Sequence, residues 1–230
     1  AGEFYLNGKW IGRHENGVTA VGFDVTDAVL LAPQENVLAV RTDNAWDYRE
    51  KSSNSRYQWN DRNFNANFGG IPKNVKLHIT DRLYQTLPLF SNLKTTGVYI
   101  YAQDFDLAAR SATIVVSSQV RNEYAEPRTF TYQVELLDAD GKFVRKFNGR
   151  AATAAPGELL NVSASEQVSG LNFWSWGYGY LYDVRTTLLV DGRPVDCTTT
   201  RTGFRKTEFA RGMVIQLVLS GMLELLYVTD

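Results

Sequence analysis

The stretch RTFTYQVELLDADGKFVRKF, residues 128–147, decides the fold class of this chain. Apolar and polar side chains alternate up to Leu137, which is typical of a strand with one buried face. The Asp140-Gly141 pair then marks a hairpin, because aspartate and glycine tolerate the positive φ angles of tight turns. Apolar residues continue through Phe147. The stretch therefore predicts two antiparallel strands joined by a short turn.

The same device recurs along the chain. Asn7-Gly8 lies between extended flanks in FYLNGKWIG (4–12), and Asp191-Gly192 does so in TTLLVDGRPVDCTT (186–199). Turn signals recur every roughly 8–15 residues, which favours an antiparallel sandwich over alternating strands and helices. Only the tail from about Met213 has a pattern that could be helical. We therefore predict an all-β chain. Further strands are expected at residues 36–42, 74–80, 97–106, 111–122 and 159–168.

A break in the alternation divides the chain into two parts. DRLYQTLPLFSNLKTT (81–96) carries Pro88 and predicts a linker at 83–96. Residues 97–209 hold about seven expected strands, the size of an immunoglobulin-like sandwich. Residues 1–82 hold about four or five, which is few for two sheets that must cover each other. Residues 210–230 form an atypical apolar tail.

Composition excludes several classes of function. The 24 Lys and Arg residues balance 25 Asp and Glu residues, so no basic face predicts nucleic acid or an anionic membrane as a partner. Cys197 is the single cysteine, which excludes an intrachain disulfide and a cysteine zinc site. The apolar run 213–228 contains Gln216 and Glu224 and is shorter than a membrane span. The compartment stays open between the bacterial cytoplasm and the periplasm or secretion.

Residues suited to catalysis are scarce. His14 and His78 are the two histidines, and we expect a loop hydrogen bond for the first and an exposed strand position for the second. Two carboxylate pairs, Asp104/Asp106 and Asp138/Asp140, fit a strand end and a hairpin turn better than the two facing sides of a cleft. DADG resembles the start of a calcium loop, but Arg150 stands where that loop needs glutamate. We therefore predict no catalytic residue, no metal site and no cofactor.

Two aromatic segments have the character of contact surfaces. WNDRNFNANFGG (59–70) combines aromatic, amide and charged side chains ahead of a glycine pair that permits close backbone approach. NFWSWGYGYLYDV (172–184) could be an aromatic platform for sugar, or a bulky corner whose Trp174 and Trp176 pack on a neighbouring domain. The sequence favours packing for the second segment and leaves the first open.

Four stretches in order, YLNGKWIGRHENGVTAVGFDVTDAV, ENVLAVRTDN, NANFGGIPKNVKLHIT and DGRPVDCTTTRTGFRKTEF, resemble the front half of glycoside hydrolase family 2, the β-galactosidase, β-glucuronidase and β-mannosidase group. The resemblance covers about residues 4–209. It implies that residues 1–82 are the later part of a sugar-binding jelly roll and that an immunoglobulin-like sandwich follows. The tail VIQLVLSGMLELLYVTD departs from the family pattern.

The resemblance also carries expectations about function. Members of the family hydrolyse glycosides with two glutamates on a (β/α)8 barrel C-terminal to this segment, and neither glutamate has a counterpart here. The chain would then be the non-catalytic front part of a β-glycosidase, most similar to β-galactosidases, with the barrel and a β-galactoside-like carbohydrate as partners. By position, Asp61 with Asn60 and Arg62 beside it, and Trp59, would contact sugar. The strand-poor first part also predicts oligomerisation through exposed edges.

Two alternatives stay open. A free-standing carbohydrate-binding module could use the same aromatic segments. A structural immunoglobulin-like interaction domain would fit the hairpins but not the family-like motifs.

Overall fold

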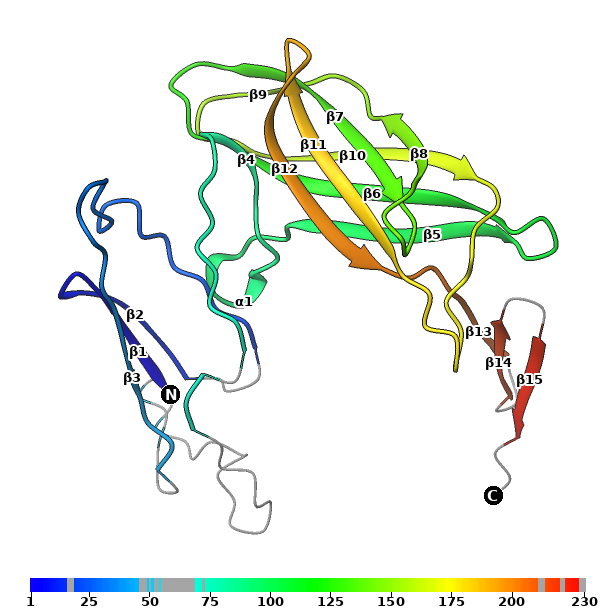
Figure 1. Ribbon diagram of the computed structural model, residues 1–230, viewed down its shortest axis with the longest axis horizontal. Coiled ribbons are helices and arrows are strands. Elements are labelled where there is room, and N and C mark those ends of the chain that lie inside the picture. Colours follow the sequence, from blue (N-terminus) through cyan, green and yellow to red (C-terminus); the bar gives the residue numbers. More distant parts are fainter. Residues whose placement is uncertain are drawn as a thin grey trace. The chain divides into compact units, whose positions relative to one another are not determined.

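The computed structural model describes residues 1–15, 19–45, 49, 51, 54, 69–71, 73–210, 214–219 and 222–227 (Figure 1). It divides the chain into two compact units, which are considered separately. The first unit is Ala1–His78 with Leu89–Lys94, and the second is Ile79–Pro88 with Thr95–Asp230. All the sheets within them are antiparallel. The predicted all-β fold class is confirmed.

The first unit contains a three-stranded sheet in the order β2-β1-β3, formed by β1 (Gly2–Leu6), β2 (Lys9–His14) and β3 (Leu38–Thr42). The hairpin predicted at Asn7-Gly8 is present, with φ angles of 52° and 80° at these residues. Asn7 also accepts a hydrogen bond from the Val37 N–H through Oδ1 (2.9 Å) and donates one to the Ala28 carbonyl (3.0 Å). The turn residue thereby joins the hairpin to the segment that precedes β3.

The strand predicted over residues 74–80 is wrong. These residues run without hydrogen-bonded pairing to any described strand, and Ile79 is 87% exposed. Val75, Leu77 and Ile79 alternate as a strand would require, but alternation stabilises a strand only when a neighbour supplies the ladder of hydrogen bonds. The segment therefore has the apolar alternation of a strand but pairs with no described strand.

Two of the described sheets of the second unit lie as layers in Figure 1 and form a sandwich. The first sheet has the order β10-β6-β4, with β5 also pairing β6, and the second has the order β12-β11-β7-β8, with β9 pairing β7. The strands of the first sheet are β4 (Leu83–Gln85), β5 (Val98–Asp106), β6 (Ser111–Asn122) and β10 (Leu159–Val168). Those of the second are β7 (Arg128–Leu137), β8 (Phe143–Asn148), β9 (Ala152–Ala154), β11 (Tyr182–Val190) and β12 (Arg193–Thr202).

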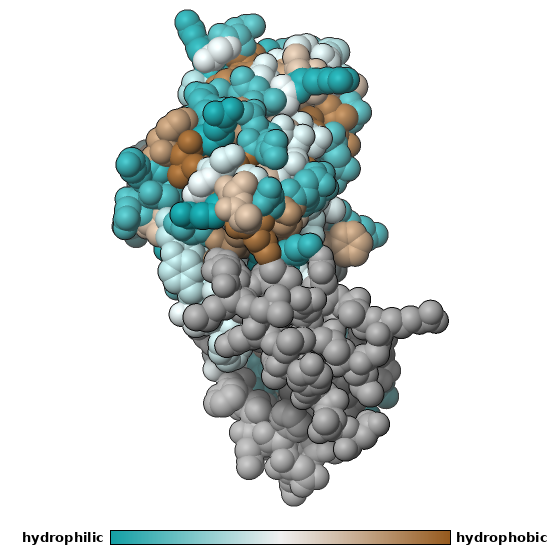
Figure 2. Space-filling view, turned by 90° about the vertical axis from the view of Figure 1, so that its right-hand side faces the viewer, coloured by the Kyte–Doolittle hydropathy of each residue, from teal (hydrophilic) through white to brown (hydrophobic). Residues whose placement is uncertain are grey.

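Alternate residues of both sheets meet in one apolar core, as in an aligned sandwich. Its largest fully buried side chains include Ile114, Val116, Phe130, Tyr132, Leu136, Leu188 and Phe204. The surface is more polar: in the face shown in Figure 2, hydrophilic residues predominate among those drawn in colour, and hydrophobic ones form small separate patches. Burial of these apolar faces is the main stabilising term of the sandwich.

Part of the predicted linker belongs to this sandwich. β4 pairs with β6, and Leu83 is fully buried in the core. The Gln85 side chain donates hydrogen bonds to the Thr186 carbonyl (3.2 Å) and to Asp196 Oδ2 (2.9 Å), and its Oε1 accepts one from Ser118 Oγ (3.2 Å). This buried polar network joins the two sheets. The short helix α1 (Phe90–Leu93), which the sequence did not predict, belongs to the first unit.

The two other predicted hairpins are present, with one difference. Asp191 and Gly192 have φ angles of 48° and 75° and form a two-residue turn between β11 and β12. Between β7 and β8 only Gly141 has a positive φ angle, 78°, because the turn is longer. Asp138 organises that turn, accepting hydrogen bonds at Oδ1 from the backbone N–H groups of Asp140 (3.0 Å) and Lys142 (2.8 Å).

The tail is extended. β13 (Lys206–Ala210), β14 (Val214–Leu219) and β15 (Met222–Tyr227) pair in that order, so the suggestion of a helix from Met213 is wrong for the described residues. Valine and isoleucine favour extended structure, and the tail pairs as strands although its apolar residues alternate poorly. Among the described residues, no helix has the length and hydropathy needed to span a membrane.

Candidate functional site

The residues predicted to contact sugar, Trp59, Asn60, Asp61 and Arg62, lie outside the described residues. The glycine pair that follows them is described. A Cβ on Gly69 would lie 2.7 Å from Asn44 Nδ2, and Gly70 has a φ angle of 89°. A side chain at Gly69 would displace the Asn44 amide, whereas the positive φ angle of Gly70 favours glycine through backbone geometry.

A charged cluster in the first unit surrounds Glu3. Its carboxylate pairs with Arg13 (3.0 Å), Arg41 (3.4 Å) and Lys51 (3.9 Å), and Arg13 also pairs with Glu15 (3.0 Å). The hollow beside them has a volume of about 120 Å³ and is lined by Ala1, Glu3, Arg13, Arg41, Asp43, Arg49 and Lys51. Glu3 joins β1 to β2 and β3 through Arg13 and Arg41, and Glu15 holds the same Arg13 guanidinium, so the two carboxylates do not face a substrate as an acid and a nucleophile.

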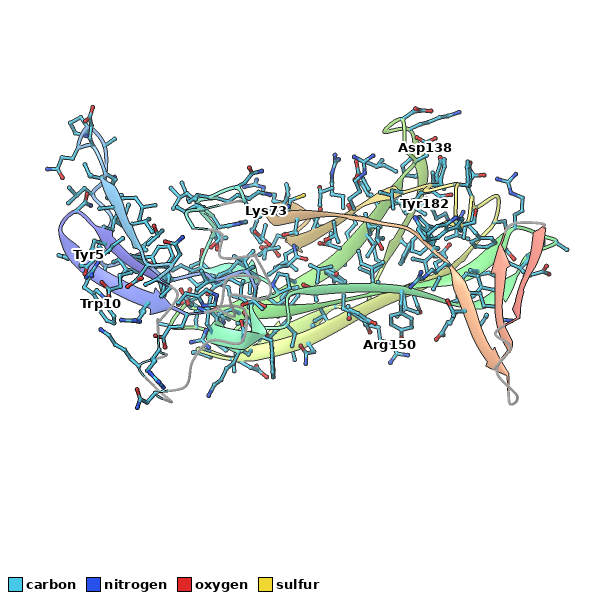
Figure 3. The ribbon with its side chains drawn as sticks, turned by 90° about the horizontal axis from the view of Figure 1, so that it is seen from below. Tyr5, Trp10, Lys73, Asp138, Arg150 and Tyr182 are labelled. Atoms are coloured by element: carbon cyan, nitrogen blue, oxygen red, sulfur yellow. The ribbon has the colours of Figure 1, made fainter. Side chains whose placement is uncertain are left out.

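The two carboxylate pairs found in the sequence are turn residues. Asp138 accepts two backbone hydrogen bonds at the end of the β7–β8 hairpin, where Figure 3 labels it. Asp104 has a φ angle of 52° at the irregularity in β5, and Asp106 Oδ1 accepts a hydrogen bond from the Ala109 N–H (2.9 Å). Neither pair is opposed across a cleft, as glycoside hydrolysis requires.

The histidines also have the surroundings expected for structural residues. His14 ends β2, and its Nε2 lies 3.2 Å from Thr19 Oγ1. His78 is exposed, although in a segment without a strand. Among the residues that the structure describes, no three His, Cys, Asp or Glu side chains group closely enough to hold a metal ion.

Aromatic side chains of the second unit gather at a tight turn before β11, called here the aromatic turn (Trp174–Tyr180). Ser175 and Tyr178 exchange both backbone hydrogen bonds (3.0 Å each), and Gly177 between them has a φ angle of 78°. Trp176 therefore stands at the tip of the turn and is 77% exposed. A tryptophan so exposed leaves a large apolar ring in solvent, and tryptophan contributes strongly to binding energy where a partner buries it.

The aromatic turn is fixed to the core by a ladder of rings. Tyr178 stacks on Tyr180 (centroids 5.8 Å apart), Tyr180 meets Tyr182 (5.1 Å), and Tyr182 meets the buried Phe204 (5.3 Å). The Tyr182 hydroxyl accepts a hydrogen bond from the Asn172 N–H (2.7 Å), while burial raises the pKa of Tyr182. Contacts between aromatic rings of this kind add rigidity beyond the area they bury.

Arg205, which the sequence did not single out, completes this surface. Its guanidinium carbon lies 5.3 Å from the centre of the Trp174 ring, and the Trp174 N–H donates a hydrogen bond to the Phe204 carbonyl (2.8 Å). The aromatic turn thus lies where β12 ends and the chain leaves the sandwich. A cation that follows a buried aromatic residue at a strand end was the available signal. The contact of Arg205 with Trp174 could be recognised only from the fold, since the two residues are 31 positions apart in the sequence.

The described residues thus define a class: an all-β chain with an immunoglobulin-like sandwich and an exposed aromatic turn, without an opposed carboxylate pair. The comparisons with known proteins give the family. Residues 98–205 match the model of the Glycosyl hydrolases family 2, to which this sandwich belongs, and the resemblance seen in the sequence is confirmed.

Relatives and solved structures extend the match to the first unit. A β-glucuronidase of Formosa agariphila is 31% identical over 209 residues, which are 90% of this chain and 21% of that protein. A β-galactosidase of Thermoanaerobacter pseudethanolicus is 23% identical over 89% of this chain and 24% of its own length. A solved β-glucuronidase from glycoside hydrolase family 2 superposes with a TM-score of 0.79 at 29% identity, over 90% of this chain and 21% of that one. The chain therefore spans about a fifth to a quarter of these relatives.

Proposed function

We propose that this chain is the non-catalytic front part of a family 2 β-glycosidase, which supports a catalytic barrel and helps to bind carbohydrate. The observation that carries the proposal is the partial match: nine tenths of this chain corresponds to about a fifth of a β-glucuronidase. The arrangement of carboxylates supports it. Without two opposed carboxyl groups nothing can protonate the leaving oxygen or attack the anomeric carbon, and the described pairs serve turns and ion pairs.

The aromatic turn is the surface we assign to the barrel. Trp176, Tyr178 and Arg205 are the residue types that carry most binding energy at protein interfaces. The ring ladder holds Tyr178, and Arg205 lies over the Trp174 ring, so little side-chain entropy of these two residues would be lost on docking. In the sequence this segment favoured packing on a neighbouring domain, and the exposure of Trp176 supports that choice.

The contact with substrate is assigned to the first unit. Trp59, Asn60, Asp61 and Arg62 supply an aromatic face, an amide, a carboxylate and a guanidinium, which together could bind sugar hydroxyls and ring faces. The sugar itself is proposed as a β-galactoside, because the amino-acid sequences of this loop and of the aromatic turn resemble β-galactosidases of the family. The β-glucuronidase among the relatives makes a β-glucuronide the competing substrate.

A binding experiment tests the role as a barrel support. The 230-residue chain is titrated with a catalytic barrel of the family produced separately, and both binding and barrel activity are followed. We expect saturable binding that raises barrel activity, and Trp176→Ala to weaken the binding at least about tenfold, as for a central interface tryptophan. Trp10→Ala is the matched control: Trp10 is a 62% exposed tryptophan of the first unit, in the β1–β2 hairpin (Figure 3). Equal loss in the two variants, or none in either, would contradict the assignment of the surface.

A further inference from the structure

The outer face of the sheet formed by β5, β6 and β10 differs from ordinary sheet surface. Its outward side chains occupy alternate positions from Tyr99 to Gln103, from Thr113 to Gln119 and from Asn161 to Gln167, and none of these is charged. The residues between them, such as Ile114, Val116 and Val162, point into the core. We call this uncharged outward set the neutral face. The next outward residue of β6, Arg121, is charged and pairs with Glu123 (3.8 Å) at the end of this face.

The other outer face of the same sandwich is an internal comparison. There Glu135 pairs with Lys146 (3.3 Å) and Arg185 (3.6 Å), and Asp183 pairs with Arg201 (3.9 Å). Both faces belong to one unit and need the same solubility, so charged side chains are expected on both. The absence of charge from the centre of the β5-β6-β10 face indicates that this part meets a ligand with which a charge would be left unpaired.

The side chains of the neutral face indicate which class of ligand it could bind. Strand pairing places Ser117 of the middle strand between Tyr99 and Ser163, and Val115 between Tyr101 and Ser165. The two tyrosine rings are 5.7 Å apart, 65% and 40% exposed, and tilted by 39°. They offer aromatic surface at one edge, and hydroxyl and amide groups continue across the other two strands.

These polar groups are available to a ligand. The side chains of Asn161, Ser163, Ser165 and Gln167 make no hydrogen bond with other described residues. Hydroxyl and amide groups both donate and accept, as sugar hydroxyls do, and aromatic rings contact the apolar face of a pyranose. A protein partner fits less well, because serine is depleted in the centres of protein interfaces.

We infer that the neutral face binds an uncharged oligosaccharide, lying across the strands from the tyrosine pair toward Ser163 and Ser165. Three strands span about 10 Å in this direction, room for two sugar rings. This site is made of other residues than those at 59–62 and in the aromatic turn, and it does not depend on the proposed barrel. It would hold the chain to the polymer that an enzyme of this class degrades.

The test is calorimetric titration of the whole 230-residue chain with neutral β-linked hexasaccharides (galactan, xylan and cellulose fragments) and with an acidic oligogalacturonide. We expect saturable binding of at least one neutral ligand and a weaker response to the acidic one. Tyr99→Ala and Tyr101→Ala should each weaken binding at least tenfold, and Ser163→Glu should abolish it. All three positions are exposed or lie at a strand surface, and thermal unfolding checks that each variant folds.

Two controls keep the outcome specific. Thr199→Glu places the same charge on the other outer face, where it should leave binding unchanged. Trp176→Ala alters the aromatic turn and should also leave it unchanged. The inference is overturned if no neutral oligosaccharide binds, if binding survives all three neutral-face variants, or if Ser163→Glu instead dissociates a dimer of this chain.

Discussion

Trp174 and Arg205 hold the two ends of the aromatic surface together, since the guanidinium carbon lies 5.3 Å from the indole centre. The backbone N–H of Trp174 also donates a hydrogen bond to the carbonyl of Phe204, the residue before Arg205. A cation over an indole face is attracted by the ring quadrupole. The contact joins the segment before β11 to the residues that follow β12. The surface assigned to a partner is therefore preorganised in the chain alone.

Removing the cation should therefore lower stability slightly. We expect Arg205→Ala to reduce the free energy of unfolding by about 0.5–1 kcal/mol, the range for an exposed cation–π contact. Urea unfolding followed by tryptophan fluorescence measures it. Arg201→Ala removes a comparably placed arginine with only a long ion pair to Asp183 (3.9 Å), and should cost less. A larger loss at Arg201 would show that the stacking on Trp174 contributes nothing.

Tyr132 should tolerate loss of its hydroxyl. The residue is fully buried, and its hydroxyl has no hydrogen-bond partner of ordinary geometry, although Thr186 and Ser118 lie close enough to affect its pKa. An unpaired buried hydroxyl carries a desolvation cost, so Tyr132→Phe should raise the free energy of unfolding, by up to about 1 kcal/mol. Tyr182→Phe is the matched change at a hydroxyl that accepts a hydrogen bond from Asn172, and should lower it by about 1 kcal/mol. Chemical denaturation of both variants decides between the two signs.

The same tyrosines predict how stability depends on alkaline pH. Burial raises the pKa of Tyr132 and of Tyr182 in the folded chain above the ordinary value. The unfolded chain then loses these protons first as pH rises, so stability is full below about pH 10 and declines above it. Tyr132→Phe should make this decline shallower. Melting temperatures measured from pH 8 to pH 11 would contradict the account if the wild type and Tyr132→Phe fell in parallel.

Strand β4 should define where the sandwich begins. A chain that starts at residue 79 retains Leu83 and the Gln85 network, whereas one that starts at residue 97 loses a buried side chain and leaves Ser118 and Asp196 without their partner. We expect the first to unfold cooperatively and the second to be destabilised by several kcal/mol, about 2–5 for a buried leucine alone. In the whole chain, Gln85→Ala should cost about 1–3 kcal/mol and the exposed Gln103→Ala almost nothing. Equal stability of the two shortened chains would place the boundary at residue 97.

The sequence was sufficient for local structure and insufficient where pairing is decided far away. Asn7-Gly8 and Asp191-Gly192 predicted their hairpins, because both central residues of such turns need positive φ angles. Residues 74–80 have the alternation of a strand but no described neighbouring strand to pair with. Residues 83–85 are too short to show a pattern, yet they pair with β6. Pairing across such distances along the chain leaves no periodic signal.

The candidate site shows the same division. The composition of the aromatic turn was visible in the sequence, but the contact of Trp174 with Arg205 required the fold. The neutral face has no motif at all: it is made of alternate residues from three separated strands, which become one surface only through their register. The assignment of Trp59, Asn60, Asp61 and Arg62 remains a prediction.

Catalytic silence of this chain is the central claim, and a turnover assay tests it most directly. The purified 230-residue chain is incubated with aryl β-glucuronides and aryl β-galactosides, beside a full-length family 2 enzyme as a positive control. The account predicts that aglycone release stays at the rate of the buffer blank with both substrates. Hydrolysis by the chain that disappears when one of its own aspartates or glutamates is replaced by the corresponding amide would contradict it.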